Sequence, residues 1–314
     1  MYKYSLASDL KMQQNENLKR WSECWKATTS AVQTEPDENK VAERWNKRWE
    51  KKPEGPGSAP EEERMARSSR ETIDFLEEAG FNIEGSTILD IGCGPGTLSI
   101  PLARMGAEVT SLDISSTTLD RVREIAEREE LPVRTMECSW WSADIDELGL
   151  RKKYDLVIAS RTPSINDAET FEKMMACSKN FCYYSSFLNV GENRAHMDIQ
   201  RLILNGEEKP DDGMRHHHHR AYTMFFPFMY LYFSGYRPLV WINHRDQRLE
   251  TTWEEAAERS IRFFGRGHEL DDEAKERIRD HYRNVSYRNV SEGGVYRSNP
   301  SGCHGMMIWD VNGR

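Results

Sequence analysis

The stretch Ile88-Leu-Asp-Ile-Gly-Cys-Gly-Pro-Gly-Thr97 combines a short apolar run with three alternating glycines. The apolar run predicts a buried β-strand, and residues 97–104 after the glycines predict a helix. Glycine lets the backbone turn at positive φ and approach a ligand closely, because it has no Cβ. In an open α/β sheet, ligands bind beyond the carboxyl ends of the strands. This strand, loop and helix therefore predict a ligand site in an α/β protein.

On either side of this stretch, β-rich runs alternate with amphipathic helices. Strands are predicted at 87–91, 108–112, 133–137, 154–159 and 180–187, and helices at 61–79, 97–104, 117–130 and 171–178. Such alternation is typical of βαβ units with right-handed crossovers. Two later strands, 238–242 and 305–310, suit an antiparallel pair at one edge. We therefore expect an α/β fold: a doubly wound, mostly parallel seven-stranded sheet with an antiparallel last strand, plus a helical N-terminal segment and helical insertions.

Composition divides the chain into two parts. Residues 1–60 are polar and rich in Trp, and they end in the Pro- and Gly-containing run 53–60, which indicates a linker. Residues 61–314 are expected to form one α/β domain, with helical insertions at about 191–236 and 250–300.

Two pairs of tryptophans stand out in the N-terminal part. Trp21 and Trp25, and again Trp45 and Trp49, are four residues apart, so each pair shares one face of a helix. An aromatic helix face is buried against a neighbour. Two interpretations stay open: packing against the main body, or a lid over a binding site.

The charge and cysteine content exclude several classes of protein. The 314 residues include 43 Lys+Arg and 52 Asp+Glu, a net charge of −9 without basic blocks, which disfavours nucleic acid as a partner. The six cysteines show no CxxC spacing, which favours reduced thiols in a cytoplasm. Residues 1–10 lack the order of a signal peptide, and the apolar stretch 224–233 is shorter than the ~20 residues that cross a bilayer. We expect a cytoplasmic protein without a membrane span; no pattern assigns an oligomeric state.

The glycine spacing and two nearby acids indicate the kind of ligand. Gly92, Gly94 and Gly96 follow G-x-G-x-G, whereas a dinucleotide site has G-x-G-x-x-G. Asp90 precedes the first glycine, and a carboxylate there suits a cationic ligand group. Asp113 ends the next predicted strand about 20 residues on, where acids accept hydrogen bonds from ribose hydroxyls. The pattern favours a cationic nucleoside over NAD.

The sequence LDIGCGPGTLSIPLARMGAEVTSLDIS (89–115) resembles the opening motif of class I S-adenosylmethionine-dependent methyltransferases. YDLVIAS (154–160) is similar to the fourth strand of that family, and the resemblance covers roughly 61–188. It implies a Rossmann-like methyltransferase domain that binds S-adenosylmethionine (SAM) and releases S-adenosylhomocysteine (SAH).

The resemblance also implies roles for individual residues. Gly92, Gly94 and Gly96 would line the methionine part of SAM, Asp90 would face its amino group directly or through water, and Asp113 would hold the ribose hydroxyls. The adjacent Cys93, Ile114 and Ser160 are assigned to the same site.

The adenine contacts depart from the family pattern. Many members carry an acid after the third strand, whereas residues 137–144 here read Glu-Cys-Ser-Trp-Trp-Ser-Ala-Asp. Trp140 or Trp141 could supply a ring face for adenine, with Asp144 as a polar contact. Ordinary core packing of both rings is the alternative.

The methyl acceptor is expected beyond the fourth and fifth strands. Residues 160–163 read Ser-Arg-Thr-Pro, not the Asn/Asp-Pro-Pro-Tyr/Phe of relatives that methylate adenine amines or glutamine amides, so those acceptors are disfavoured. Arg161 could pair with an acidic acceptor group. His219 and Tyr222 are the other catalytic candidates, since a His with a pKa of about 6.5 can accept a proton from an amine or hydroxyl.

The run His216–His219 admits other interpretations. His216 and His219 could share a helix face and hold a metal with His196 or His244, but no Cys or carboxylate completes the set, so we predict no metal site. The sequence predicts a SAM-dependent methyltransferase with a small-molecule acceptor. A protein side-chain methyltransferase and a non-enzymatic SAM- or metal-sensing module remain as alternatives.

Overall fold

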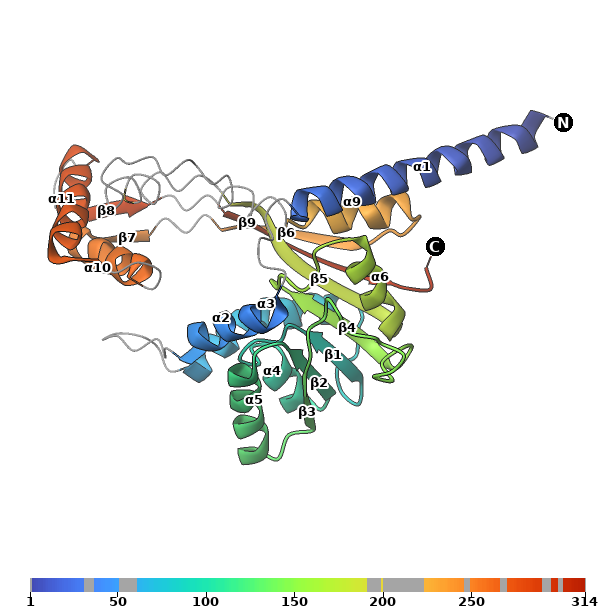
Figure 1. The fold of residues 1–314 in the computed structure, drawn as a ribbon, viewed down its shortest axis with the longest axis horizontal. Coiled ribbons are helices and arrows are strands. Elements are labelled where there is room, and N and C mark those ends of the chain that lie inside the picture. The colour runs from blue at the N-terminus through green and yellow to red at the C-terminus, as the bar shows by residue number, and fades with distance from the viewer. Residues whose placement is uncertain are drawn as a thin grey trace. The chain divides into compact units, whose positions relative to one another are not determined.

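A computed structural model describes residues 2–30, 37–50, 61–190, 199, 223–245, 249–265, 270–289, 295–298 and 302–313. The chain divides into two compact units (Figure 1). Unit 1 comprises Met1–Phe187, Arg220–Ile242 and Gly305–Arg314, and unit 2 comprises Leu188–His219 and Asn243–His304.

Unit 1 is built on a seven-stranded sheet with the order β3-β2-β1-β4-β5-β9-β6. Its strands are β1 (Thr87–Ile91), β2 (Glu108–Asp113), β3 (Val133–Glu137), β4 (Tyr154–Ser160), β5 (Ser178–Val190), β6 (Leu239–Arg245) and β9 (Gly302–Asp310). The strands from β3 to β5 pair in parallel. β9 is antiparallel to β5, because the amide of Val311, just after β9, donates to the carbonyl of Asn180 at the start of β5 (2.8 Å). The predicted α/β fold, with its antiparallel last strand beside β6, is confirmed.

Helices cover both faces of this sheet, as buried parallel strands require. The helices that alternate with these strands along the chain are α3 (Glu61–Glu78), α4 (Ser99–Arg104), α5 (Ser116–Arg128) and α6 (Ala168–Cys177). The neighbouring residues Tyr183 and Tyr184 of β5 point to opposite faces. Tyr183 contacts Phe75 of α3 (ring centroids 6.3 Å apart), and Tyr184 contacts Phe171 of α6 (6.1 Å). α3 and α6 therefore lie on opposite faces of the sheet.

The first pair of tryptophans packs into the main body. Trp25 of α1 (Tyr2–Ser30) is 1% exposed and stacks on Phe226 of α9 (Phe225–Phe233), with ring centroids 5.9 Å apart. Trp21 donates its indole N–H to the carbonyl of Phe226 (3.0 Å). α1 and α9 lie side by side in Figure 1. For this pair the structure favours packing over a lid.

Unit 2 contains the helix pair expected after the sixth strand. α10 (Trp253–Phe264) and α11 (Asp272–Asn289) pack around Ala257, Phe264 and Ile278. An antiparallel pair, β7 (Leu249–Thr252) and β8 (Val295–Ser298), accompanies them and was not expected. Four-residue strands are too short to show a hydrophobic period. None of the helices in the described ranges is both long and apolar enough to cross a bilayer.

Candidate functional site

The glycine loop joins β1 to α4 in a conformation that its three glycines make possible. Gly92, Gly94 and Gly96 have φ values of 65°, 54° and 81°. A Cβ on Gly92 would lie 2.1 Å from Oγ1 of Thr162, and one on Gly96 would lie 2.9 Å from Cγ2 of Val122. The loop is therefore packed tightly against the segment after β4 and against α5.

Gly94 differs from its two neighbours in what lies over it. A Cβ on Gly94 would meet only the ring of Trp49, at 3.8 Å. Apart from Cys93 and Pro95, no other atom of the described residues lies within 4 Å of that Cβ position. This is the cradle in which a ligand can approach the loop backbone, so the residues present fit a nucleoside cofactor.

Asp113 connects the loops that follow β1 and β2. Its Oδ2 accepts a hydrogen bond from the amide of Gly94 (2.8 Å), and its Oδ1 accepts one from the amide of Ser115 (2.8 Å). Burial raises the pKa of Asp113 above its usual value, and these two amides oppose the rise. Each carboxylate oxygen keeps a second lone pair, which can accept a hydrogen bond from a ligand hydroxyl.

Asp90 lies beneath the loop and is 2% exposed. The hydroxyl of Ser99 donates to its Oδ2 (2.7 Å). Burial is the main cause that raises the pKa of Asp90 to about 6, and the negative charge of Asp113 adds to the rise. The hydrogen bond from the Ser99 hydroxyl opposes it. Burial also raises the pKa of the Cys93 thiol, which is neutral at pH 7. A cationic ligand group would favour the ionised form of Asp90.

The two tryptophans after β3 have contacts of their own. Trp140 is 2% exposed, donates its indole N–H to the carbonyl of Thr170 (3.1 Å) and lies under Nζ of Lys173, 5.0 Å from the ring centroid. Trp141 is half-buried, and its indole N–H donates to the carbonyl of Pro163 (3.4 Å). These contacts favour the packing interpretation for Trp140.

Lys173 fastens the loop that carries these rings. Its ammonium donates to the backbone carbonyls of Trp140, Trp141 and Ala143. Asp144 accepts from the amides of Asp146 and Glu147 (2.8 and 3.1 Å) and so closes a turn in the same loop. These hydrogen bonds within the protein thus fix the conformation of the loop after β3.

The end of β4 brings the predicted acceptor region next to the glycine loop. The hydroxyls of Ser160 and Ser185 are hydrogen-bonded (2.8 Å), and the amide of Arg161 donates to the carbonyl of Ser185 (2.8 Å). Arg161 is exposed and has a φ of 50°, which is costly for a residue with a side chain. Thr162 follows it and contacts the glycine loop.

The structure thus brings the loop glycines, Asp90, Asp113, the half-buried Ile114 and the end of β4 to one edge of the sheet. His219 and Tyr222 lie outside the described residues, as do His216 and His196. The structure describes only parts of the two predicted insertions, at about 191–236 and 250–300.

Sequence reasoning missed the contribution of α2 (Glu38–Glu50) to this edge. Oδ1 of Asn46 accepts a hydrogen bond from the hydroxyl of Ser115 (2.7 Å), two residues after Asp113. The available signal was the helical stripe that contains Trp45, Asn46 and Trp49. The tryptophans predicted a buried face, either packed against the main body or over a binding site, but they gave no role to Asn46.

Comparison with known proteins covers the same part of the chain. Residues 88–180 match the family described as Methyltransferase domain. A ubiquinone biosynthesis O-methyltransferase of Rhodopseudomonas palustris is 32% identical over 77 residues, 24% of this chain and 28% of that protein. A ribosomal protein L11 methyltransferase of Helicobacter hepaticus is 33% identical over 94 residues, 30% of this chain and 28% of that protein.

Among solved structures, magnesium protoporphyrin IX methyltransferase from Synechocystis with bound SAH has 15% identity and a TM-score of 0.48, and the match covers 87% of this chain and 98% of that one. The chain spans about a third or less of the length of the curated relatives it matches. The glycine loop and both acids fall inside residues 88–180, so the segment that matches the methyltransferase domain family is the one that carries this site on the α/β fold.

Proposed function

We propose that this protein is a SAM-dependent methyltransferase with a small-molecule acceptor. The observation that carries the proposal is the glycine loop folded against Asp113, with all three loop glycines at positive φ and Asp90 buried beneath. When bound, SAM supplies a methyl group already activated by its sulfonium. The protein has to orient the reactants, exclude water and, for a protonated nucleophile, accept a proton.

The residues of the glycine loop divide this work. The backbone of Gly92, Gly94 and Gly96 lines the methionine part of the cofactor, without side chains in the way. The carboxylate of Asp90 compensates the charge of the amino group, directly or through water. The carboxylate of Asp113 accepts hydrogen bonds from the ribose hydroxyls and is held in position by two backbone amides.

The remaining assignments concern the adenine and the acceptor. Cys93, Ile114 and Ser160 adjoin the same edge, and Trp141 offers a half-buried ring for adenine. Arg161 extends from the end of β4, where it can pair with an acidic acceptor group. His219 and Tyr222 are candidate acceptor contacts, with His219 as the candidate proton acceptor.

Two observations favour a small-molecule acceptor. The curated relatives include a ubiquinone biosynthesis O-methyltransferase. The sequence Ser160–Pro163 also lacks the motif of enzymes that methylate glutamine amides. A protein acceptor is the second candidate, because 30% of the chain also matches a ribosomal protein L11 methyltransferase.

A labelling experiment separates these candidates. The purified full chain is incubated with cell lysate and SAM labelled on its methyl group, and the label is followed in the small-molecule and macromolecular fractions. We expect protein-dependent label in the small-molecule fraction. Label in protein alone would select the second candidate, and label in neither fraction would contradict methyl transfer.

We also infer a cytoplasmic location. The five cysteines that the structure describes, Cys24, Cys93, Cys138, Cys177 and Cys182, are all free thiols. Free thiols at buried positions agree with a reducing compartment.

A further inference from the structure

We propose that α2 forms the outer wall of the cofactor site, with the ring of Trp49 over the bound cofactor and the side chain of Asn46 as its latch. This inference rests on the proposed function, because it concerns the same site. It adds to that site a helix that lies outside the matched methyltransferase domain.

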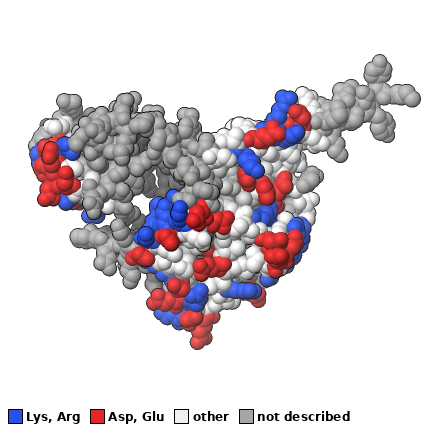
Figure 2. Space-filling view, viewed as in Figure 1, with Lys and Arg blue, Asp and Glu red and all other residues white. Residues whose placement is uncertain are grey.

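The burial of α2 shows which of its faces is covered. Val41 is buried, and Ala42, Trp45, Asn46 and Trp49 are half-buried. These residues recur at helical spacing, so they form one stripe. The opposite face carries basic side chains that are all exposed: Lys40, Arg44, Lys47 and Arg48. Figure 2 shows Lys and Arg gathered over this helix.

Hydrogen bonds attach α2 to the segments that follow two neighbouring strands, β2 and β3. The hydroxyl of Ser142, beyond β3, donates to the carboxylate of Glu38 at the first turn of α2 (2.7 Å). The hydroxyl of Ser115, beyond β2, donates to Asn46 (2.7 Å), and the amide of Thr117 donates to the same oxygen (3.3 Å).

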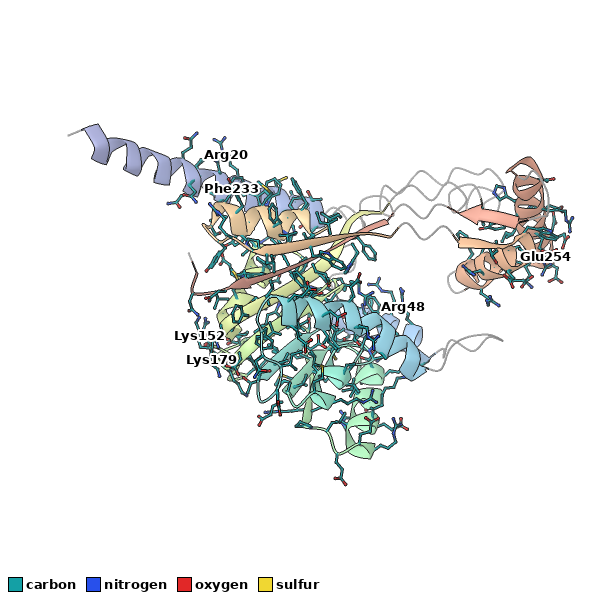
Figure 3. The ribbon with its side chains drawn as sticks, turned by 180° about the vertical axis from the view of Figure 1, so that it is seen from behind. Arg20, Arg48, Lys152, Lys179, Phe233 and Glu254 are labelled. Atoms are coloured by element: carbon teal, nitrogen blue, oxygen red, sulfur yellow. The ribbon has the colours of Figure 1, made fainter. Side chains whose placement is uncertain are left out.

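The last turn of α2 is held as well. The guanidinium of Arg121 on α5 donates to the carbonyl of Trp49 (2.7 Å). In Figure 3, Arg48 of α2 lies on the opposite side of unit 1 from Lys152 and Lys179, which mark the amino ends of β4 and β5. α2 therefore crosses the carboxyl edge of the sheet, where ligands of open α/β sheets bind.

The ring of Trp49 is placed over the part of the glycine loop that faces open space. Its Cζ2 lies 3.8 Å from the Cβ position of Gly94, whose amide is bonded to Asp113. From Glu38 to Trp49 the helix rises roughly 16 Å, comparable to the length of an extended nucleoside cofactor. α2 is thus in contact with the glycine loop and borders the position of a ligand held by Asp113.

This enclosure has a kinetic consequence. Movement of α2 away from Ser115 and Gly94 opens the site for entry and release of the cofactor and its product. The wall therefore slows dissociation of SAH, and loosening it should speed dissociation more than association. An aromatic ring at this position also excludes water from the cofactor, which favours a displacement at carbon.

The first test removes the ring of Trp49 in the full chain. Dissociation of SAH is measured by stopped-flow displacement for the wild type, Trp49→Ala and Trp49→Phe. We expect Trp49→Ala to release SAH about tenfold faster, the equivalent of one partly buried large side chain, and Trp49→Phe to remain closer to the wild type. The matched control is Trp241→Ala, since Trp241 is 41% exposed on the edge strand β6, four strands away from β1.

The second test addresses the hydrogen bonds that Asn46 accepts from Ser115 and Thr117. Asn46→Leu removes the acceptor for Ser115 and Thr117 and should speed SAH release about fivefold. Asn46→Asp keeps an oxygen acceptor at the amino end of α5, where a negative charge is favourable, and should restore slow release. Unchanged thermal unfolding of each variant verifies that the fold is intact.

The outcomes separate this inference from the proposed function. A wild type that does not bind SAH contradicts the proposed function. A wild type that binds SAH, with Trp49→Ala and Asn46→Leu releasing it at the wild-type rate, contradicts only the assignment of α2. Faster release from both Asn46 variants, or from Trp241→Ala as well, would also overturn it, because the effect would not depend on the latch or on Trp49.

Discussion

Two helices of unit 1 carry the same pair of tryptophans at the same spacing, but their surroundings differ. In α1 the ring of Trp25 is 1% exposed and packs against the aromatic rings of Phe171, Phe226 and Tyr230. In α2 the ring of Trp49 stays half-buried beside a glycine loop, and the helix is held by polar bonds. The same spacing of two tryptophans thus forms a core contact in α1 and a cover over the glycine loop in α2. The difference lies in the residues against which each helix packs.

The largest difference should appear in stability. Trp25→Ala should lower the free energy of unfolding of unit 1 by about 3–5 kcal/mol, because it leaves a cavity in a packed cluster. Urea denaturation followed by circular dichroism measures this. A loss below 1 kcal/mol would mean that α1 is no more firmly packed than α2.

SAH binding, unlike the stability tested with Trp25, should depend on Asp113 and the glycine loop. Asp113→Ala should weaken SAH binding by about 1–3 kcal/mol, since it leaves ligand hydroxyls and the amides of Gly94 and Ser115 unpaired. Isothermal titration calorimetry provides the measurement. Asp120→Ala is the control, because Asp120 is exposed on α5 and pairs only with Arg123 among the contacts described for it. Equal affinities for both variants would place the ribose elsewhere.

The pH dependence of binding tests Asp90. Its pKa of about 6 in the folded protein lies above the usual 3.8, so the carboxyl gains its charge as the pH rises through 6. A cationic ligand favours the charged form, and SAH affinity should therefore fall about tenfold from pH 7.5 to pH 5. Asp90→Asn should flatten this profile. A wild-type profile that is already flat would remove Asp90 from the site.

The raised pKa of Asp90 also makes stability depend on pH. This dependence runs in the opposite direction to that of ligand affinity. At a pH well below 3.8 Asp90 is protonated in both the folded and the unfolded chain. As the pH rises towards 6 the unfolded chain loses this proton first, so the contribution of Asp90 to stability is lost across that window. Ligand affinity should rise over the range in which this contribution falls.

The smallest effect completes the comparison of the two helices. Trp49→Ala should change the free energy of unfolding by about 1 kcal/mol or less, because its ring is only half-buried at the edge of the core. Urea denaturation beside Trp25→Ala measures the contrast. Similar losses for the two variants would show that both helices are ordinary core elements.

Much of the fold could be predicted because its signals are local. The apolar run of β1, the alternating glycines and the two acids lie within 26 residues of each other, from Ile88 to Asp113. Turn chemistry and strand period act over this range, so β1 and β3 were predicted at their observed bounds. The last two strands were predicted as an antiparallel pair at one edge, but their order in the sheet was not predicted.

The rest depends on contacts between distant residues. Ser115 and Asn46 are 69 positions apart, and nothing in either local sequence indicates their hydrogen bond. The contact of Thr162 with Gly92 likewise exists only because β4 pairs with β1. Trp140 was open to two interpretations because ring burial is set by Lys173 and Thr170, which follow it by about one βα unit.

The central claim is that the glycine loop, Asp90 and Asp113 hold a sulfonium nucleoside beneath α2. A crystal structure of the full chain grown with SAH tests it most directly. We predict the ribose hydroxyls on the carboxylate of Asp113, the methionine part along Gly92 to Gly96 and the ring of Trp49 against the ligand. Crystals in which that edge of the sheet holds no SAH, or holds it away from Asp113, would contradict the claim.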